Sequence, residues 1–205
     1  MIELFISSFV TFFVVIDPPG CAPIYASLTN SVPERDRRIM AVRAIIVAAI
    51  ILLVFALFGE AMLGALGISL DSFRIAGGIM LFLIALEMVF EKRTERREDR
   101  AQEIIEKPEI EDVSIFPMAM PMIAGPGSIA AVMLLTSQND GIDNALTILG
   151  ALGAVLLLTL LGLLAAGPMM RALGNKVEAV ITRVLGVLLG ALAVQFVVDG
   201  LNASF

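Results

Sequence analysis

An aspartate, two prolines and a glycine stand together inside an apolar stretch near the start of the chain, VVIDPPGCAPIYASLT (residues 14–29). Pro18 disfavours helical backbone at Asp17, and the two prolines together remove two backbone donors. Helical carbonyls before this point lose their partners, and a new helix begins with free N–H groups. The carboxylate and the freed carbonyls suit a cation, which could be a proton, Na⁺ or a substrate ammonium. The free N–H groups suit an anion.

A second break of the same kind is predicted 107 positions later, where Pro126 corresponds to Pro19. Its sequence is AGPGSIA, and Ser128 is placed to cap the helix that restarts there. We expect the two helix starts to face each other and to hold a substrate carboxylate, while Asp17 holds the ammonium group or the coupling cation. The predicted substrate-binding residues are Asp17, Pro18, Pro19, Gly20, Cys21, Gly125, Pro126, Gly127, Ser128 and Gln195.

Each of these features also has a structural interpretation. A proline alone can kink a transmembrane helix without any further role. Asp17 can act as a helix cap that organises the break, and this role is compatible with substrate binding. Gln195, a lone amide in the last apolar segment, can reach the site or form an interhelical hydrogen bond. Glu87, near the end of the third segment, can turn toward the membrane interface or pair with Arg93.

The elements that carry these residues are apolar segments of about membrane-spanning length. Hydrophobic residues make up 59% of the 205 residues and charged residues 17%. A soluble bundle is not favoured, because runs such as 145–166 lack the polar stripe that would face water. Six segments are predicted: Ile2–Leu28, Ile39–Phe58, Ser72–Phe90, Val113–Leu135, Asn144–Gly167 and Val177–Val198. The predicted fold is therefore an all-α, polytopic membrane protein with broken helices in the first and fourth spans.

Asp17 is predicted to lie within the lipid bilayer. It follows Ile2 by 15 residues, which is about 22 Å of helix and shorter than the roughly 30 Å hydrocarbon core. An ionisable group there costs about 3 kcal/mol or more unless it faces a cavity or a partner. We therefore expect the break to line a cavity or to be buried in protein.

Ordered correspondences relate the two halves of the chain. The Ala-Leu-Gly sequence at 65–67 recurs 107 positions later at 172–174, and Thr29 corresponds in the same way to Thr136. Three spans per half is an odd number, so the second half must enter the membrane from the opposite side. We expect two inverted-topology repeats, residues 1–90 and 113–205, joined by a charged loop at 91–112, with the binding site between the repeats.

The basic residues predict the orientation. Thirteen of the fourteen lie in or beside the odd-numbered connections, and Arg74 alone falls near the other side. By the positive-inside rule, loops 30–38, 91–112 and 168–177 are cytoplasmic and both termini are outside, in a prokaryotic inner membrane. The 91–112 segment is expected to be a solvated, charge-rich loop with some helix, and a partner-binding role is the alternative.

Several function classes lack support. The net charge of −6 argues against nucleic-acid binding. Histidine is absent and Cys21 is the single cysteine, so neither an internal disulfide nor a thiolate metal cluster is predicted. Nucleotide-binding and hydrolase motifs are absent, so no cofactor, no metal and no enzymatic activity are expected. The protein is expected to lie in the lipid bilayer. The sequence does not decide whether it forms a homo-oligomer.

Four motifs together resemble the MarC family of integral membrane proteins. They are IDPPG near the start, RIAGGIMLFLIALEM in the third segment, AGPGSIA in the fourth and RVLGVLLGALAVQFVVDG near the end. The resemblance covers essentially the whole chain. That family belongs to a wider superfamily with the LysE amino-acid exporters, and some members are assigned as transporters of small neutral amino acids. The resemblance implies a six-span inner-membrane transporter, and it gives the matched residues motif membership rather than individual roles.

The expected function is secondary transport of a small zwitterionic solute, coupled to or driven by a cation gradient, with a neutral amino acid as the first candidate. The first alternative is a passive channel or exporter of small metabolites, lined by the same breaks. Two weaker alternatives are a membrane-embedded enzyme and a scaffold that recruits a cytoplasmic partner through the 91–112 loop.

Overall fold

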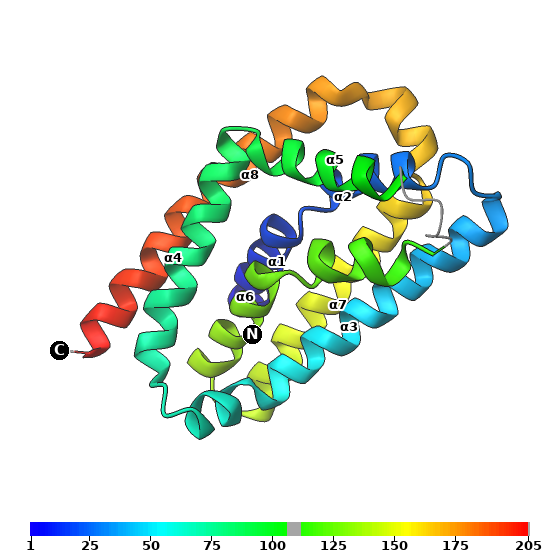
Figure 1. Ribbon diagram of the computed structural model, residues 1–205. Helices are drawn as coiled ribbons and strands as arrows, with labels where there is room; N and C mark the ends of the chain where they lie inside the picture. The colour runs from blue at the N-terminus through cyan, green and yellow to red at the C-terminus, as the bar shows by residue number, and fades with distance from the viewer. Residues whose placement is uncertain (106–111, 205) are drawn as a thin grey trace.

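Helices make up nearly all of the computed structural model, which describes residues 1–105 and 112–204 (Figure 1). Their bounds are α1 (Ile2–Ile16), α2 (Pro18–Leu28), α3 (Glu34–Ala65), α4 (Leu70–Val89), α5 (Lys92–Ile105), the irregular π-type segment η1 (Ser114–Ile123), α6 (Pro126–Gln138), α7 (Ile142–Leu164) and α8 (Ala166–Ser204). These described residues contain no strand. The all-α prediction is therefore confirmed.

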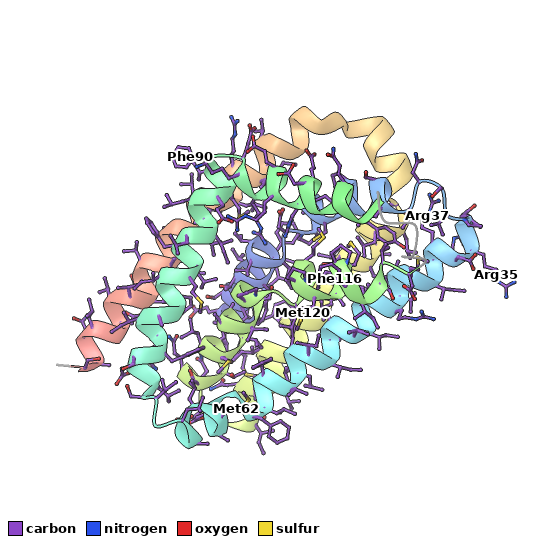
Figure 2. All side chains as sticks on the ribbon, in the orientation of Figure 1. Arg35, Arg37, Met62, Phe90, Phe116 and Met120 are labelled. Carbon is purple, nitrogen blue, oxygen red and sulfur yellow. The ribbon has the colours of Figure 1, made fainter. Side chains whose placement is uncertain are left out.

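Five stretches among the described residues are long and apolar enough to cross a membrane: Ile2–Leu28, Glu34–Ala65, Leu70–Val89, Ile142–Leu164 and Val180–Ser204. The bent pair of η1 and α6, whose axes meet at 53°, makes a sixth if it counts as one crossing. Large apolar side chains cover the outside of the bundle. Figure 2 shows Met62 and Phe90 projecting outward, where 44% and 65% of their surface is exposed. The prediction of a multi-pass membrane protein is confirmed.

Some helices run past the predicted apolar segments at one or both ends. α3 begins at Glu34 rather than Ile39 and ends at Ala65 rather than Phe58. Glu34 lies in its first turn, where a negative side chain interacts favourably with the positive end of the helix dipole. Hydropathy therefore predicts where a span lies better than where its helix ends.

α4 lies side by side with the C-terminal part of α8 in Figure 1. Small residues allow this close approach. A Cβ added at Gly78 of α4 would lie 2.8 Å from the carbonyl oxygen of Ala193, and one at Gly186 of α8 would lie 2.8 Å from the Cβ of Met88. Glycine is therefore required at these two positions by the distance between the helix backbones.

Two short helices, α2 and α6, lie in the interior of the bundle. Eight of the thirteen residues of α6 are buried, in a nearly continuous run from Gly127 to Leu135. In α2, Cys21, Ala22 and Tyr25 are fully buried. A helix that is apolar and buried on most sides belongs in the centre of a fold. Asp17 and Gly125, at which the breaks are predicted, immediately precede these two helices.

The charged segment at 91–112 contains α5, which lies across one end of the bundle between α4 and α2 (Figure 1). Arg93, Arg97 and Ala101 are spaced four residues apart and so share one face of the helix. Ala101 is 3% exposed. The helix expected within this segment is present, and one of its faces packs onto the bundle rather than lying in solvent. Positions 106–111 of the predicted loop lie outside the described residues.

Replacing Gly78 with alanine is expected to destabilise the packing of α4 on α8, because the added Cβ would overlap the α8 backbone. Overpacking of this kind costs about 1–3 kcal/mol. The measurement is the thermal unfolding midpoint of the detergent-solubilised protein. The matched control is Gly150→Ala in α7, where nothing lies within 4 Å of the added atom. Equal midpoints for the two variants would contradict this account.

Candidate functional site

The chain turns sharply at Asp17, which ends α1 and begins α2. Its φ of 58° and ψ of 66° are left-handed, a conformation that few residues other than glycine adopt. Its carboxylate accepts a hydrogen bond from the N–H of Gly20, with 3.2 Å between Oδ1 and N. Pro18 and Pro19 fill the first turn of α2, where their missing N–H groups cost little. The capping role considered for Asp17 is therefore present.

The geometry of the junction also explains the glycine and the cysteine of the IDPPGC motif. An added Cβ at Gly20 would overlap the carboxylate of Asp17 and lie 3.0 Å from Nη1 of Arg97. The Cys21 thiol donates to the carbonyl of Ile16, with 3.4 Å between Sγ and O. That carbonyl lies in the last turn of α1, where helical partners are lost. Gly20 thus gives the carboxylate room, and Cys21 satisfies a freed carbonyl.

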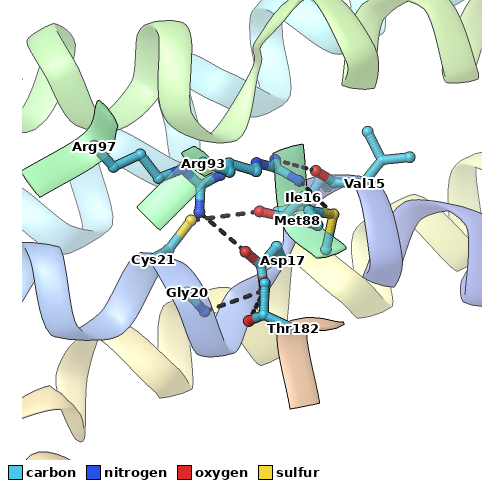
Figure 3. A network of polar contacts seen from close by, with 9 residues as sticks. All are labelled: Val15, Ile16, Asp17, Gly20, Cys21, Met88, Arg93, Arg97 and Thr182. Carbon is cyan, nitrogen blue, oxygen red and sulfur yellow. Dashed lines mark hydrogen bonds and ion pairs between the residues drawn. The ribbon is translucent and has the colours of Figure 1, made fainter. Parts of the chain in front are cut away.

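Asp17 is 1% exposed and pairs with Arg97 of α5 (Figure 3). Nη1 of Arg97 lies 3.1 Å from Oδ2, and only 10% of the arginine side chain is exposed. The hydroxyl of Thr182 in α8 donates a longer hydrogen bond, 3.5 Å, to Oδ1. A buried ion is costly unless it is paired and hydrogen-bonded. The carboxylate meets both conditions through donors from three separate helices.

Arg93 lies one turn before Arg97 and reaches the same junction (Figure 3). Its Nη2 donates to the carbonyl of Val15 at 2.7 Å, and its Nη1 to Sδ of Met88 at 3.0 Å. A cation at this place also complements the negative end of the α1 dipole. Burial, and then the neighbouring Arg97 cation, lowers the pKa of Arg93 to about 10, so Arg93 stays protonated at neutral pH.

Sequence reasoning missed Arg93 and Arg97 as partners of the first break. The available signal was the four-residue spacing that places Arg93, Arg97 and Ala101 on one helical face. Arg97 now occupies the position expected for an ammonium group or coupling cation at Asp17. The predicted pairing of Glu87 with Arg93 is corrected, because Glu87 pairs with Arg96 at 2.6 Å.

The second junction lies between η1 and α6. Gly125 is the N-cap of α6, and no side chain caps this end. Ser128 does not cap the helix as predicted, because it is already the third helical residue and lies past the capping position. An added Cβ at Gly127 would lie 2.5 Å from Cδ1 of Ile84 and 3.2 Å from Cγ1 of Val15. Gly127 is therefore required where α6 packs between α4 and α1.

A cavity of about 370 Å³ lies between the start of α6 and the arginine face of α5. It is lined by Val15, Met80, Leu83, Ile84, Glu87, Arg93, Arg96, Arg97, Pro121, Met122, Gly125, Pro126, Gly127 and Ser128. The N–H groups of Gly127 and Ser128 belong to the first turn of α6 and have no partner within the helix. Together with the arginines, they give the cavity the chemistry of an anion site.

The structure brings together only part of the predicted site. Gly125, Pro126, Gly127 and Ser128 line the cavity. Five other predicted residues surround the first junction, and none of them lines the cavity. Four are buried, namely Asp17, Pro18, Gly20 and Cys21, and Pro19 is half-buried.

Gln195 lies apart from both groups. It is exposed on α8, and its Nε2 donates to Asp199 of the same helix at 2.7 Å. It follows Thr182 by 13 residues, which is about 20 Å along a helix. Because Thr182 marks the level of Asp17, Gln195 is not near the first junction. Its hydrogen bond is within one helix rather than between helices.

Arg97→Gln is expected to destabilise the protein by about 3–5 kcal/mol, because it leaves the buried Asp17 carboxylate without its counter-ion. Combining it with Asp17→Asn should recover part of this loss, since no buried charge is then uncompensated. Unfolding of the purified variants measures this double-mutant cycle. Arg38→Gln, which removes an exposed pair with Glu34, should change stability by less than about 1 kcal/mol. Additive losses in the double variant would contradict coupling between Asp17 and Arg97.

Relatives of similar length cover the whole chain. Residues 2–205 match the family described as MarC family integral membrane protein. A UPF0056 membrane protein of Methanocaldococcus jannaschii is 37% identical over 99% of this chain and 98% of its own. The UPF0056 membrane protein YvbG of Bacillus subtilis (strain 168) is 32% identical over 100% of this chain and 97% of its own. No solved structure matches. The resemblance seen in the sequence motifs is confirmed, and the chain belongs to the MarC family of integral membrane proteins.

Proposed function

We propose that the protein is a secondary transporter of a small zwitterionic solute, with a neutral amino acid as the first candidate. The observation that carries the proposal is the cavity at the start of α6, inside a multi-pass membrane protein and next to a buried carboxylate. Its volume of about 370 Å³ falls within the usual range for small-molecule sites. Ionisable groups within membrane-spanning segments commonly mark the path of a solute or ion.

The two charged groups of a zwitterion have separate partners at this site. The free N–H groups of Gly127 and Ser128 suit the carboxylate. Asp17 suits the ammonium group or a coupling cation, H⁺ or Na⁺, but Arg97 covers its carboxylate in this conformation. Transport then requires a second conformation in which Arg97 has moved away. A solute that binds this second conformation more tightly would shift the protein toward it.

The proposal includes broken first and fourth spans and two inverted-topology repeats, residues 1–90 and 113–205. The left-handed backbone at Asp17 and the 53° bend between η1 and α6 support the breaks. Pro18-Pro19 and Pro126 start α2 and α6 at corresponding places in the two halves. In transporters built from such repeats, the halves rock about a site at their interface.

Cysteine labelling tests the proposed orientation, with loops 30–38, 91–112 and 168–177 cytoplasmic and both termini outside. In a Cys21→Ala background, a cysteine at the exposed position Asp140 should react with a membrane-impermeant thiol reagent in intact cells. A cysteine at the exposed position Glu98 should react only after permeabilisation. The reverse pattern would contradict the orientation.

Counterflow of labelled glycine or alanine in proteoliposomes tests the transport proposal, with and without a proton or Na⁺ gradient. The wild-type protein should give saturable counterflow, and Asp17→Asn should reduce it to background because the ammonium or cation partner is lost. Asp140→Asn, an exposed carboxylate in a connection, is the matched control and should retain counterflow.

Normal transport by Asp17→Asn would show that the charge of Asp17 is not essential for transport. Ohmic conductance in a planar bilayer, without saturation or counterflow, would instead favour the passive channel.

A further inference from the structure

The arginines at the cavity outnumber the carboxylates that compensate them. Arg93, Arg96 and Arg97 line it. Glu87 pairs with Arg96 at 2.6 Å, and Asp17 pairs with Arg97 at 3.1 Å. Arg93 has neutral acceptors, the carbonyl of Val15 and the sulfur of Met88. Among these groups, one positive charge has no carboxylate of its own.

This excess charge lies where water cannot fully stabilise it. Burial and the neighbouring Arg97 cation both oppose protonation of Arg93 and lower its pKa to about 10. Arg93 is partly buried, and the two carboxylates that attract it already pair with the other two arginines. An anion bound in the cavity would supply the missing compensation, and Gly127 and Ser128 of the first turn of α6 line the same cavity.

We propose that the cavity binds the oxyanion group of a ligand, a carboxylate or a phosphate, against Arg93 and Arg97 of α5. Guanidinium groups present planar pairs of donors that match both of these groups. This anion site rests on the proposed function in one respect, namely that the solute binds in this cavity. Binding to the cavity can be measured without measuring transport. Arg97 is then shared, because an anion in the cavity competes with Asp17 for its donors.

Two sources could supply this oxyanion. One is the carboxylate of a soluble solute, as in the proposed transport. The other is the phosphate of a lipid headgroup, because Met80 and Leu83, the apolar residues that line the cavity from α4, are 36% and 54% exposed. The recognition chemistry is the same for both, so an experiment must separate them.

Ligand-induced thermal stabilisation of the protein purified in dodecyl maltoside, a detergent without phosphate, measures binding to the cavity. The probes are glycine, acetate and inorganic phosphate, with ethylamine as the cationic control, and a second set of samples contains added phosphatidylglycerol. We expect saturable stabilisation by at least one oxyanion, or by phosphatidylglycerol, and none by ethylamine. Arg93→Gln should weaken the apparent affinity by about tenfold or more, because it removes a charge-assisted hydrogen bond.

Matched variants separate binding from folding. Arg93→Lys keeps the charge and should recover part of the affinity, whereas the surface variant Arg38→Gln should leave it unchanged. If Arg93→Gln fails to fold, the Asp17→Asn, Arg97→Gln double variant removes one of the two proposed donors without leaving a buried carboxylate unpaired. It should show a similar loss of affinity.

Each result has a defined meaning. A response to a soluble oxyanion identifies a solute site, whereas a response to phosphatidylglycerol alone identifies a lipid-headgroup site. Absence of any oxyanion or lipid response, or affinity unchanged by Arg93→Gln, overturns the proposal. Oxyanion binding without glycine or alanine counterflow contradicts the proposed function while the anion site stands. Counterflow with an unchanged KM in Arg93→Gln contradicts the anion site while transport stands.

Discussion

The ion pair between Asp17 and Arg97 joins a carboxylate inside the membrane bundle to a helix that its charges would place in solvent. A buried carboxylate is costly without compensation, so the residues around Asp17 must leave room for the ion pair and supply hydrogen-bond donors to it. Gly20 must lack a side chain to leave room for the carboxylate, and Thr182 of α8 supplies a further donor. Since Arg93 also holds the end of α1, α5 is fixed across that end of the bundle. The buried Asp17 carboxylate thus helps to position four helices, namely α1, α2, α5 and α8.

The two junctions differ in a way that assigns them different roles. At the first, the Asp17 carboxylate already accepts the Gly20 N–H, so part of the anion-binding capacity of α2 is used internally. At the second, Gly125 provides no side-chain cap, and the first N–H groups of α6 have no partner within the helix. The cavity lies at this second junction, where the arginines of α5 also converge. In the proposed transport, the first junction supplies the negative charge and the second receives the anion.

Much of the architecture follows from hydropathy and from the helix-breaking residues. The apolar runs predicted the membrane-spanning segments, and the Asp-Pro-Pro-Gly sequence predicted that helix α1 ends at this point, because proline cannot continue a helix ladder. The docking of α5 was not predicted. A run of arginines in a charged segment usually lies in solvent, and the sequence alone does not show that Asp17 lies beside Arg97 in the folded protein. Gln195 was misplaced for a related reason: a polar residue in an apolar helix needs a partner, and Asp199, one turn away, supplies it locally.

A structure determined with saturating glycine or alanine tests the central claim most directly, namely that a solute binds between the start of α6 and the arginines of α5. The account predicts solute density in this cavity, with the carboxylate against Gly127, Ser128 and Arg93 and with Arg97 moved away from Asp17. Solute bound elsewhere, with the Asp17–Arg97 pair intact and the cavity empty, would contradict it.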